Sequence, residues 1–235
     1  MKVYSNFIEG KRFESKFSDL SHIDFSFFFD YKATTEQLAQ SRLNIFTHEE
    51  PNEYFGMHDW ILQNHEKFSF VFTLNDRVLR KCPNSQLMLF GESWLDDGTD
   101  RITKKRDKKF EVSHLTGKKL LSYGHWIRHQ IFNRQDEITV PKKFYSTIGT
   151  MDTFQDNISG KDFMLGESMF SVAIENSSHN HYFTEKITDC VLMKTIPLYW
   201  GCTNIEKYYD SRGLIFINGD DHAIDVINNL TEKDY

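Results

Sequence analysis

The chain is 235 residues long, which is enough for one large domain or two small ones. Hydrophobic residues make up 39% of it and aromatic residues 15%, enough to build a core, so a chain that is disordered throughout is excluded. With 28 Lys and Arg against 34 Asp and Glu, the formal net charge is −6. The overall field therefore does not favour nucleic acid as a partner, although a local basic site for a small anion remains open.

The three cysteines, Cys82, Cys190 and Cys202, are odd in number and widely spaced. This pattern indicates neither a disulfide framework nor a structural zinc site, so we expect reduced thiols. No apolar run is long enough for the core of a signal peptide or for a transmembrane segment. We therefore expect a cytoplasmic protein, although a secretory-pathway enzyme trimmed of its anchor would have the same pattern.

The first half of the chain alternates short apolar, β-rich runs with helical patterns, which is typical of an α/β protein with parallel strands. The expected strands are 23–29, 43–47, 68–74 and 86–90, and the expected helices are 58–65 and 76–82. In the second of these helices Asp76 is the expected N-cap and Pro83 ends the helix.

Residues 96–111 are almost entirely polar and carry both signs of charge, so we interpret them as a domain linker. The basic cluster Lys104-Lys105-Arg106 also fits a nucleic-acid patch, but the interleaved acids favour a solvated linker. The expected domains are therefore 1–112, which ends in the linker, and 113–235.

The alternation resumes after the linker. The expected strands of the second domain are 118–122, 170–174, 196–200 and 214–217, and the expected helices are 126–133 and 184–193. The sequence thus predicts two small α/β units.

A polar loop, residues 175–183, follows the expected strand 170–174, where open parallel sheets bind their ligands. It leads into a helix whose first turn carries Lys186. Exposed N–H groups at a helix N-terminus, together with an ammonium group, suit a phosphate or diphosphate, and Glu185 would accept hydrogen bonds from sugar hydroxyls. Spacing alone favours a plainer interpretation, in which Glu185 and Asp189 only complement the positive end of the helix.

Three runs in this half of the chain share one family resemblance. They are Phe170-Ser-Val-Ala-Ile-Glu-Asn-Ser177, Tyr182-Phe-Thr-Glu-Lys-Ile-Thr-Asp189, and Ile196-Pro-Leu-Tyr-Trp-Gly201 with the following Asn204-Ile-Glu206. In order and spacing these runs resemble the donor-binding region of the family 10 glycosyltransferases, the α1,3/α1,4-fucosyltransferases. The resemblance implies a GT-B type fold of two small Rossmann-like domains with a cleft between them, GDP-fucose as the nucleotide-sugar donor, and inversion at the anomeric carbon.

The resemblance also implies roles for individual residues. Glu175, Asn176, Tyr182, Glu185 and Lys186 would line the donor site. Within this set, Lys186 would contact the diphosphate and Glu185 would contact hydroxyl groups.

Arg128, at the end of Gly124-His-Trp-Ile-Arg128, is similar to the family's arginine that contacts the donor diphosphate. A guanidinium suits that task because its planar fork donates to two oxygens at once. Without the resemblance, Arg128 would be interpreted as a surface residue of a helix. Arg134 is six residues further along, on the opposite face of the same helix, and is the weaker candidate.

Glu49, Glu50 and Pro51 follow closely on the expected strand 43–47. They resemble the Glu-x-Pro of the family's acceptor domain, in which the glutamate is the general base. Such a group is required because the acceptor hydroxyl must lose its proton as it attacks. Register favours Glu49, with Glu50 as the alternate, and by residue type alone two acids before a proline are also an ordinary loop.

His179 and His181 form a His-x-His pair, but no third ligand at a recognised spacing accompanies them. Asp96-Asp97 is not the Asp-x-Asp that presents a divalent ion to nucleotide sugars. We therefore expect that no cofactor is required; a divalent metal is compatible with the sequence but not implied by it. Arginine, lysine and helix N–H groups would then stabilise the leaving diphosphate.

The sequence thus predicts an inverting glycosyltransferase that transfers fucose from GDP-fucose to a hydroxyl of a glycan or glycoconjugate acceptor. One alternative is a transferase of the same fold that uses another nucleotide sugar. The other is a catalytically silent carbohydrate-binding protein. The absence of a recognisable anchor or signal favours a microbial or viral type of enzyme.

Overall fold

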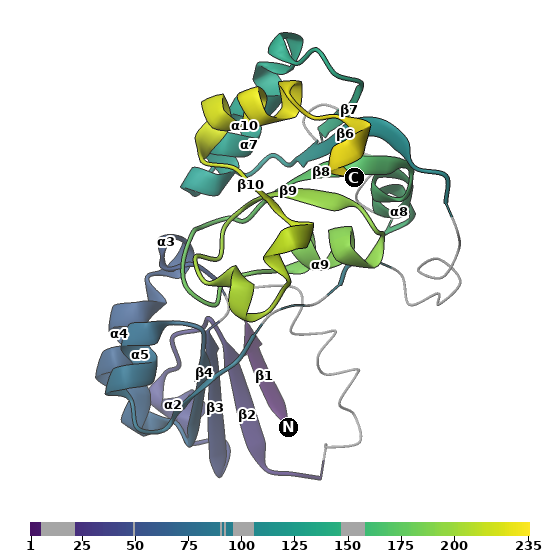
Figure 1. Cartoon of the computed structure of the whole chain (residues 1–235). Helices are drawn as coiled ribbons and strands as arrows, with labels where there is room; N and C mark the ends of the chain where they lie inside the picture. Colours follow the sequence, from purple (N-terminus) through teal and green to yellow (C-terminus); the bar gives the residue numbers. More distant parts are fainter. Residues whose placement is uncertain (6–21, 49, 90, 92, 96–105, 147–157) are drawn as a thin grey trace. The chain divides into compact units, whose positions relative to one another are not determined.

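The computed structural model describes residues 1–5, 22–48, 50–89, 91, 93–95, 106–146 and 158–235 (Figure 1). The chain divides into two compact units, Met1–Leu89 and Phe90–Tyr235. Each unit contains a five-stranded sheet in which every strand pair is parallel. None of the helices in the described part of the chain combines the length and apolar character that crossing a membrane requires.

The first unit has its strands in sequential order, β1-β2-β3-β4-β5. The strands are β1 Lys2–Ser5, β2 Phe25–Phe29, β3 Leu43–His48, β4 Phe70–Thr73 and β5 Ser85–Leu87; the helices are α2 Thr35–Leu38, α3 Asn52–Phe55, α4 Met57–Asn64 and α5 Asp76–Lys81, with a 3-10 turn at His65–Lys67. Figure 1 shows α4 and α5 next to each other against the sheet. Their apolar faces close the core of this unit through the fully buried Ile61 and Val78, which join Phe28, Phe46 and Val71 of the sheet.

The expected strands and helices of the first unit are confirmed, whereas β1, α2 and α3 were not anticipated. The expectation that Asp76 is the N-cap of α5 is wrong. The side-chain oxygen of Asn75, not that of Asp76, accepts hydrogen bonds from the N–H groups of Arg77 (3.0 Å) and Val78 (3.1 Å). Asp76 is therefore the first residue inside the helix, where its charge complements the helix dipole.

The second unit has the strand order β10-β9-β8-β6-β7. The strands are β6 Lys109–Thr116, β7 Lys142–Ser146, β8 Ser168–Ile174, β9 Ile196–Trp200 and β10 Ile215–Phe216; the helices are α7 Tyr123–Asn133, α8 Ile158–Glu167, α9 Glu185–Leu192 and α10 Gly219–Asn228, with 3-10 turns at Gln135–Glu137, Ile205–Lys207, Ser211–Gly213 and Glu232–Asp234.

The second sheet is covered on both faces. One core contains Ile127 of α7 and Ile224 of α10, and the other contains Leu165 of α8 and Ile187 of α9. Figure 1 shows α7 and α10 next to each other, while α8 and α9 lie across the sheet from them.

The order of the strands reverses between β6 and β8, because β7 lies on one side of β6 and all later strands lie on the other. Such a switch point is where open α/β sheets form their ligand sites.

The expected strand at 118–122 is wrong. The strand is β6, which lies immediately before it and begins inside the expected linker. Leu120 and Leu121, which suggested a strand, are each 61% exposed in an irregular turn. The expected strands at 170–174, 196–200 and 214–217 and the helices at 126–133 and 184–193 are confirmed, whereas β7, α8 and α10 were not anticipated.

The structure assigns residues just before the expected linker, and residues within it, to the second unit. Leu95, directly before the linker, is buried in the core of that unit, and the N–H of Trp94 donates to Asp189. Within the expected linker, Lys108 donates to the carbonyls of Leu165 and Ser168. The two units therefore divide at Leu89 and Phe90, earlier than the expected boundary at residue 112. Most of the expected linker, residues 96–105, lies outside the described residues.

Candidate active site

The polar loop after β8 is fastened to the start of α9 by one buried carboxylate. Glu175 is fully buried; its Oε1 accepts the N–H of Thr184 (2.9 Å) and its Oε2 accepts the Thr184 hydroxyl (2.7 Å). Thr184 is in turn the N-cap of α9. Burial raises the pKa of the Glu175 carboxyl, and Lys186, whose Nζ lies 3.6 Å from Oε2, opposes that shift. Glu175 therefore fixes the geometry of the helix start and the position of Lys186.

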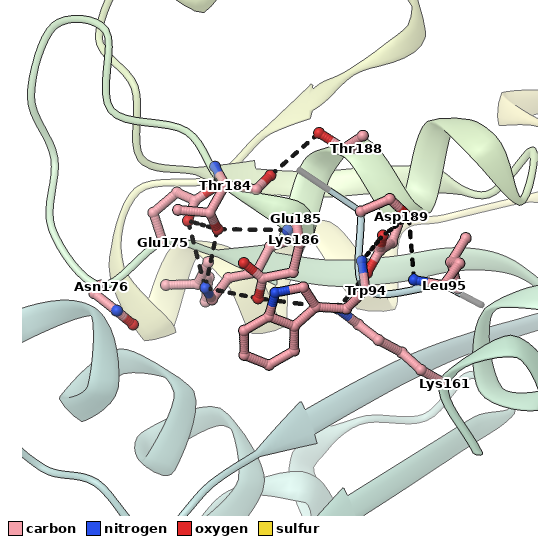
Figure 2. Close-up of polar contacts among 12 residues, drawn as sticks. Trp94, Leu95, Lys161, Glu175, Asn176, Thr184, Glu185, Lys186, Thr188 and Asp189 are labelled. Carbon is pink, nitrogen blue, oxygen red and sulfur yellow. Dashed lines mark hydrogen bonds and ion pairs between the residues drawn. The ribbon is translucent and has the colours of Figure 1, made fainter. Parts of the chain in front are cut away.

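Lys186 and Glu185 form a buried ion pair in the first turn of α9 (Figure 2). The Lys186 Nζ donates to the Glu185 Oε1 at 3.2 Å, and the Lys161 Nζ lies 3.9 Å from the same oxygen. Burial by itself opposes ionisation of Glu185, but Lys186 and Lys161 outweigh it and lower the pKa of Glu185 to about 2. In the same way, burial lowers the pKa of Lys186, but the carboxylates of Glu185 and Glu175 reverse that effect and raise it.

Arg128 approaches the same end of β8 from α7. Its Nη2 donates to Asn176 Oδ1 at 2.9 Å, and its Nη1 donates to the carbonyl of Ile174, the last residue of β8. Gly124, one turn earlier, makes this approach geometrically possible. Its N–H donates to the Asn176 carbonyl (3.2 Å), and a Cβ at position 124 would lie 1.8 Å from the Glu175 carbonyl oxygen.

The surroundings of His125 indicate that positive charges of α7 and α9 lie near each other. Its Nδ1 lies 2.7 Å from the Ser122 hydroxyl, and the ring is almost completely buried. Burial, together with the nearby charges of Arg128, Lys119 and Lys186, lowers its pKa to about 3. The Arg128 charge also acts on Lys186 directly. The two residues expected to contact a diphosphate therefore lie near each other at the switch point.

The remaining residues of the loop have structural partners. Tyr182 is buried and packs edge-on against His179 at 6.2 Å between ring centroids. His179 Nε2 lies 2.8 Å from the Ser177 hydroxyl, whereas His181 Nδ1 contacts the Tyr208 hydroxyl. The two histidines thus have different partners, and within the described ranges no group of three or more His, Cys, Asp or Glu side chains is arranged to hold a metal ion.

Arg134, the weaker arginine candidate, is occupied elsewhere. Its guanidinium bonds to Asp220 and Asp221 of α10 (2.7 Å each) and to Glu137 (2.8 Å). The pairs with Asp220 and Asp221 join the end of α7 to α10.

The surroundings of Asp189 differ from the sequence-based expectation of a charge that complements the helix end. Asp189 is fully buried; its Oδ1 accepts the Ser93 hydroxyl (2.7 Å) and the Trp94 N–H (3.0 Å), and its Oδ2 accepts the ammonium of Lys161 (Figure 2). The plainer interpretation of Asp189 is therefore wrong. Ser93, Trp94 and Lys161 carry no local signal for this role, because only the tertiary fold brings them to α9.

In the first unit, Glu49, the favoured base, lies outside the described residues. Its neighbour Glu50 donates its N–H to the Asp30 Oδ2 at 2.8 Å. Asp30 is buried at the end of β2 with φ +45°, and its Oδ1 lies 3.8 Å from His48 Nε2. The segments after Asp30 and after Pro51 line a pocket of about 280 Å³. The pocket-lining residues are Tyr31, Lys32, Phe55 and Met57.

Comparison with known proteins agrees with the sequence resemblance. Residues 117–231 match the family model "Glycosyltransferase family 10 (fucosyltransferase) C-term". An 82-residue stretch is 32% identical to the alpha-(1,3)-fucosyltransferase FucT of Helicobacter pylori; it covers 34% of this chain and 17% of that protein. The match to this curated relative thus spans only a small part of its length.

Solved structures extend the likeness over both units. A crystal structure of an alpha1,3-fucosyltransferase aligns with 99% of this chain and 79% of its own, with a TM-score of 0.60 at 17% identity. Its complex with GDP-fucose aligns with a TM-score of 0.59 at 17% identity, over 99% of this chain and 78% of its own. TarM aligns with a TM-score of 0.57 at 10% identity, over 92% of this chain and 51% of its own. The expected GT-B type of α/β fold is confirmed.

Proposed function

Residues 117–231 match the C-terminal model of glycosyltransferase family 10, and from this match we propose that the protein is a fucosyltransferase. In this proposal it transfers fucose from GDP-fucose to a hydroxyl of a glycan or glycoconjugate acceptor, with inversion at the anomeric carbon. A solved relative of the same fold was crystallised with GDP-fucose, which supports the choice of donor.

The observation that carries the proposal is the convergence of Arg128 and Lys186. One cation comes from the helix after β6 and the other from the helix after β8, so they meet where the strand order reverses. Lys186 keeps about a fifth of its side-chain surface exposed and lies in the first turn of α9. An ammonium, a guanidinium and helix N–H groups together stabilise the charge that develops on a departing diphosphate, so the proposal requires no metal ion.

Glu185 supplies the carboxylate that accepts hydrogen bonds from hydroxyls of the donor. Because its pKa is about 2, the carboxylate is ionised at neutral pH and accepts hydrogen bonds only. We assign it to hydroxyls of the ribose or the sugar. Glu175 and Asn176 are already bonded, so their proposed contribution to the donor site is to hold Lys186 and Arg128 in position. Tyr182 is buried against His179, and its proposed contribution is to support the loop.

The general base is proposed to be Glu49, with Glu50 as the alternate. Attack on the anomeric carbon from the face opposite the diphosphate gives inversion, and the attacking hydroxyl transfers its proton to the carboxylate. Backbone anchoring of Glu50 by Asp30 supports a defined position for this loop.

The pocket beside this loop is the proposed place of the acceptor sugar. Its volume of about 280 Å³ is near the lower end of the range for small-molecule sites, and Tyr31 and Phe55 offer it aromatic surface. We expect Phe55→Ala to raise the KM for the acceptor while leaving the Kd for GDP unchanged. An unchanged acceptor KM would show that the acceptor binds elsewhere.

Release of GDP from GDP-fucose against a panel of acceptors tests the proposed function. Thermal shift with GDP and UDP separately tests the nucleotide: stabilisation by UDP alone would rule out GDP-fucose. Glu49→Ala should abolish release while nucleotide binding persists. If Glu50→Ala abolishes release and Glu49→Ala does not, the base is Glu50, and if no acceptor is fucosylated while carbohydrate binds, the protein is a binding protein.

A further inference from the structure

Trp94 presents an exposed indole ring on a rigid backbone. The ring is 59% exposed, yet the N–H of the same residue donates to the fully buried Asp189 carboxylate at 3.0 Å. The preceding Ser93 hydroxyl donates to the same oxygen at 2.7 Å. Since both anchors lie outside the indole, the backbone that carries the ring is fixed while the ring stays uncovered.

The indole shares a cation with the candidate donor site. The Lys161 Nζ lies 5.3 Å from the centroid of the Trp94 ring, within the range of a cation–π contact. The same ammonium bonds to Asp189 and lies 3.9 Å from Glu185 Oε1. Figure 2 shows the indole beside Glu185 and Lys186.

The charged groups therefore follow one another in a fixed order. The charge of Arg128 acts on Lys186, and the Lys186 ammonium pairs with the Glu185 carboxylate. The same carboxylate pairs with Lys161, whose ammonium lies over the Trp94 ring. A nucleoside diphosphate has a matching order of diphosphate, ribose and base. With the diphosphate at the first two cations and the ribose hydroxyls at Glu185, the base extends toward the indole.

We propose that Trp94 stacks on the nucleobase of the donor, an inference that rests on the proposed function of the site. Base–aromatic stacking uses the π-face that every base has, so it adds affinity for the nucleoside part. An exposed indole on a fixed backbone offers that surface with little loss of conformational freedom on binding.

Trp94→Ala in the full chain tests the proposal, with GDP and inorganic pyrophosphate as the two probes. Both probes bind through the diphosphate cations, but only GDP has a base. We expect the Kd for GDP to rise about 5- to 100-fold, while the Kd for pyrophosphate stays the same. Trp94→Phe keeps an aromatic face and should restore most of the affinity for GDP. The backbone bond from residue 94 to Asp189 persists in both variants.

Tryptophan fluorescence gives a second readout. GDP should quench the wild-type protein and the control Trp126→Phe, whose lost ring stacks on Tyr123, but should quench Trp94→Phe less. Equal losses of GDP and pyrophosphate affinity in Trp94→Ala would overturn the proposal, because they would indicate displaced cations. So would an unchanged Kd for GDP, or a change confined to the acceptor KM, which would assign the ring to the acceptor. If the wild-type protein binds neither probe, the proposed function itself fails.

Discussion

The Asp30 carboxylate holds the backbone N–H of Glu50 at 2.8 Å, and in doing so ties the end of β2 to the loop that follows β3. Asp30 is buried and has φ +45°, a conformation that non-glycine residues adopt rarely and that Asp tolerates better than most. The backbone of Glu50, one of the two candidate bases, is therefore held by a group outside its own loop.

We predict that Asp30 positions this loop. Asp30→Ala would leave the partly buried N–H of Glu50 without this acceptor, at a cost of about 1 kcal/mol, and would lower kcat more than it changes the KM for the donor. Asp30→Asn keeps an oxygen acceptor and should recover part of kcat. Steady-state kinetics and thermal unfolding of each variant check this.

Asp24 provides the matched control, because its carboxylate also accepts a backbone N–H, that of Arg42 at 3.1 Å, at the opposite end of the same strand. Asp24→Ala should leave kcat unchanged. Equal effects of the two alanine variants on kcat would show that Asp30 stabilises the fold but does not position the loop.

Gly124 is predicted to be irreplaceable for a steric reason. The added Cβ of Gly124→Ala would meet the Glu175 carbonyl oxygen at 1.8 Å, and this neighbour is backbone that cannot rotate away. We expect lower thermal stability and weaker GDP binding, because α7 and the end of β8 must separate. Gly213→Ala, where nothing lies within 4 Å of the added atom, should change neither property. Normal GDP binding by Gly124→Ala would contradict the close approach.

The local sequence pattern was sufficient to predict an element where the tertiary environment of that element agreed with the pattern. The apolar run of β8 and the N-cap Thr184 before α9 specify their elements directly, and the donor loop lies between them. Arg128 and Lys186 were predicted as diphosphate contacts through the family resemblance, and the parallel topology, which brings the ends of β6 and β8 together, explains why they lie near each other.

Strand β6 could not be predicted because its buried polar residues are satisfied only by distant partners. Glu111 accepts the Ser168 hydroxyl at 3.0 Å and pairs with Lys143 at 3.1 Å. The imidazole of His114 lies 3.0 Å from the Arg128 carbonyl. Without these partners the segment has the composition of a solvated linker, and the contacts of Asp189 with Trp94 and Lys161 are hidden for the same reason.

Arg128→Lys is predicted to be a severe substitution. Lysine keeps the charge but loses the planar fork, so it cannot bond to Ile174 and Asn176 and still offer a donor to the diphosphate. Loss of one charge-assisted hydrogen bond should lower kcat/KM for the donor about 10- to 100-fold.

The control is Arg134→Lys on the same helix, where the guanidinium serves ion pairs to α10. It should leave kcat/KM for the donor unchanged, and any effect should be on thermal stability. A similar loss of kcat/KM in both variants would indicate that the integrity of α7, and not the Arg128 fork, is responsible.

The ionised state of Glu185 predicts a specific pH dependence of stability. Its pKa in the folded protein is about 2, against an ordinary value of 4.5 for a glutamate side chain. Between these values the unfolded chain binds more protons than the folded one, so the free energy of unfolding rises with pH in this window. The stabilisation is complete above pH 4.5 and is lost as the pH falls toward 2; a shift of this size corresponds to roughly 3 kcal/mol.

Glu185→Gln removes the titrating group and should flatten that part of the profile. We expect the difference in free energy of unfolding between wild type and Glu185→Gln to grow from pH 2 to pH 4.5 and to be constant from there to pH 7. Urea unfolding at a series of pH values measures it. A difference that does not vary with pH would mean that Lys186 and Lys161 do not hold the carboxylate in its ionised form, and the assignment of Glu185 as a hydroxyl acceptor would lose its basis.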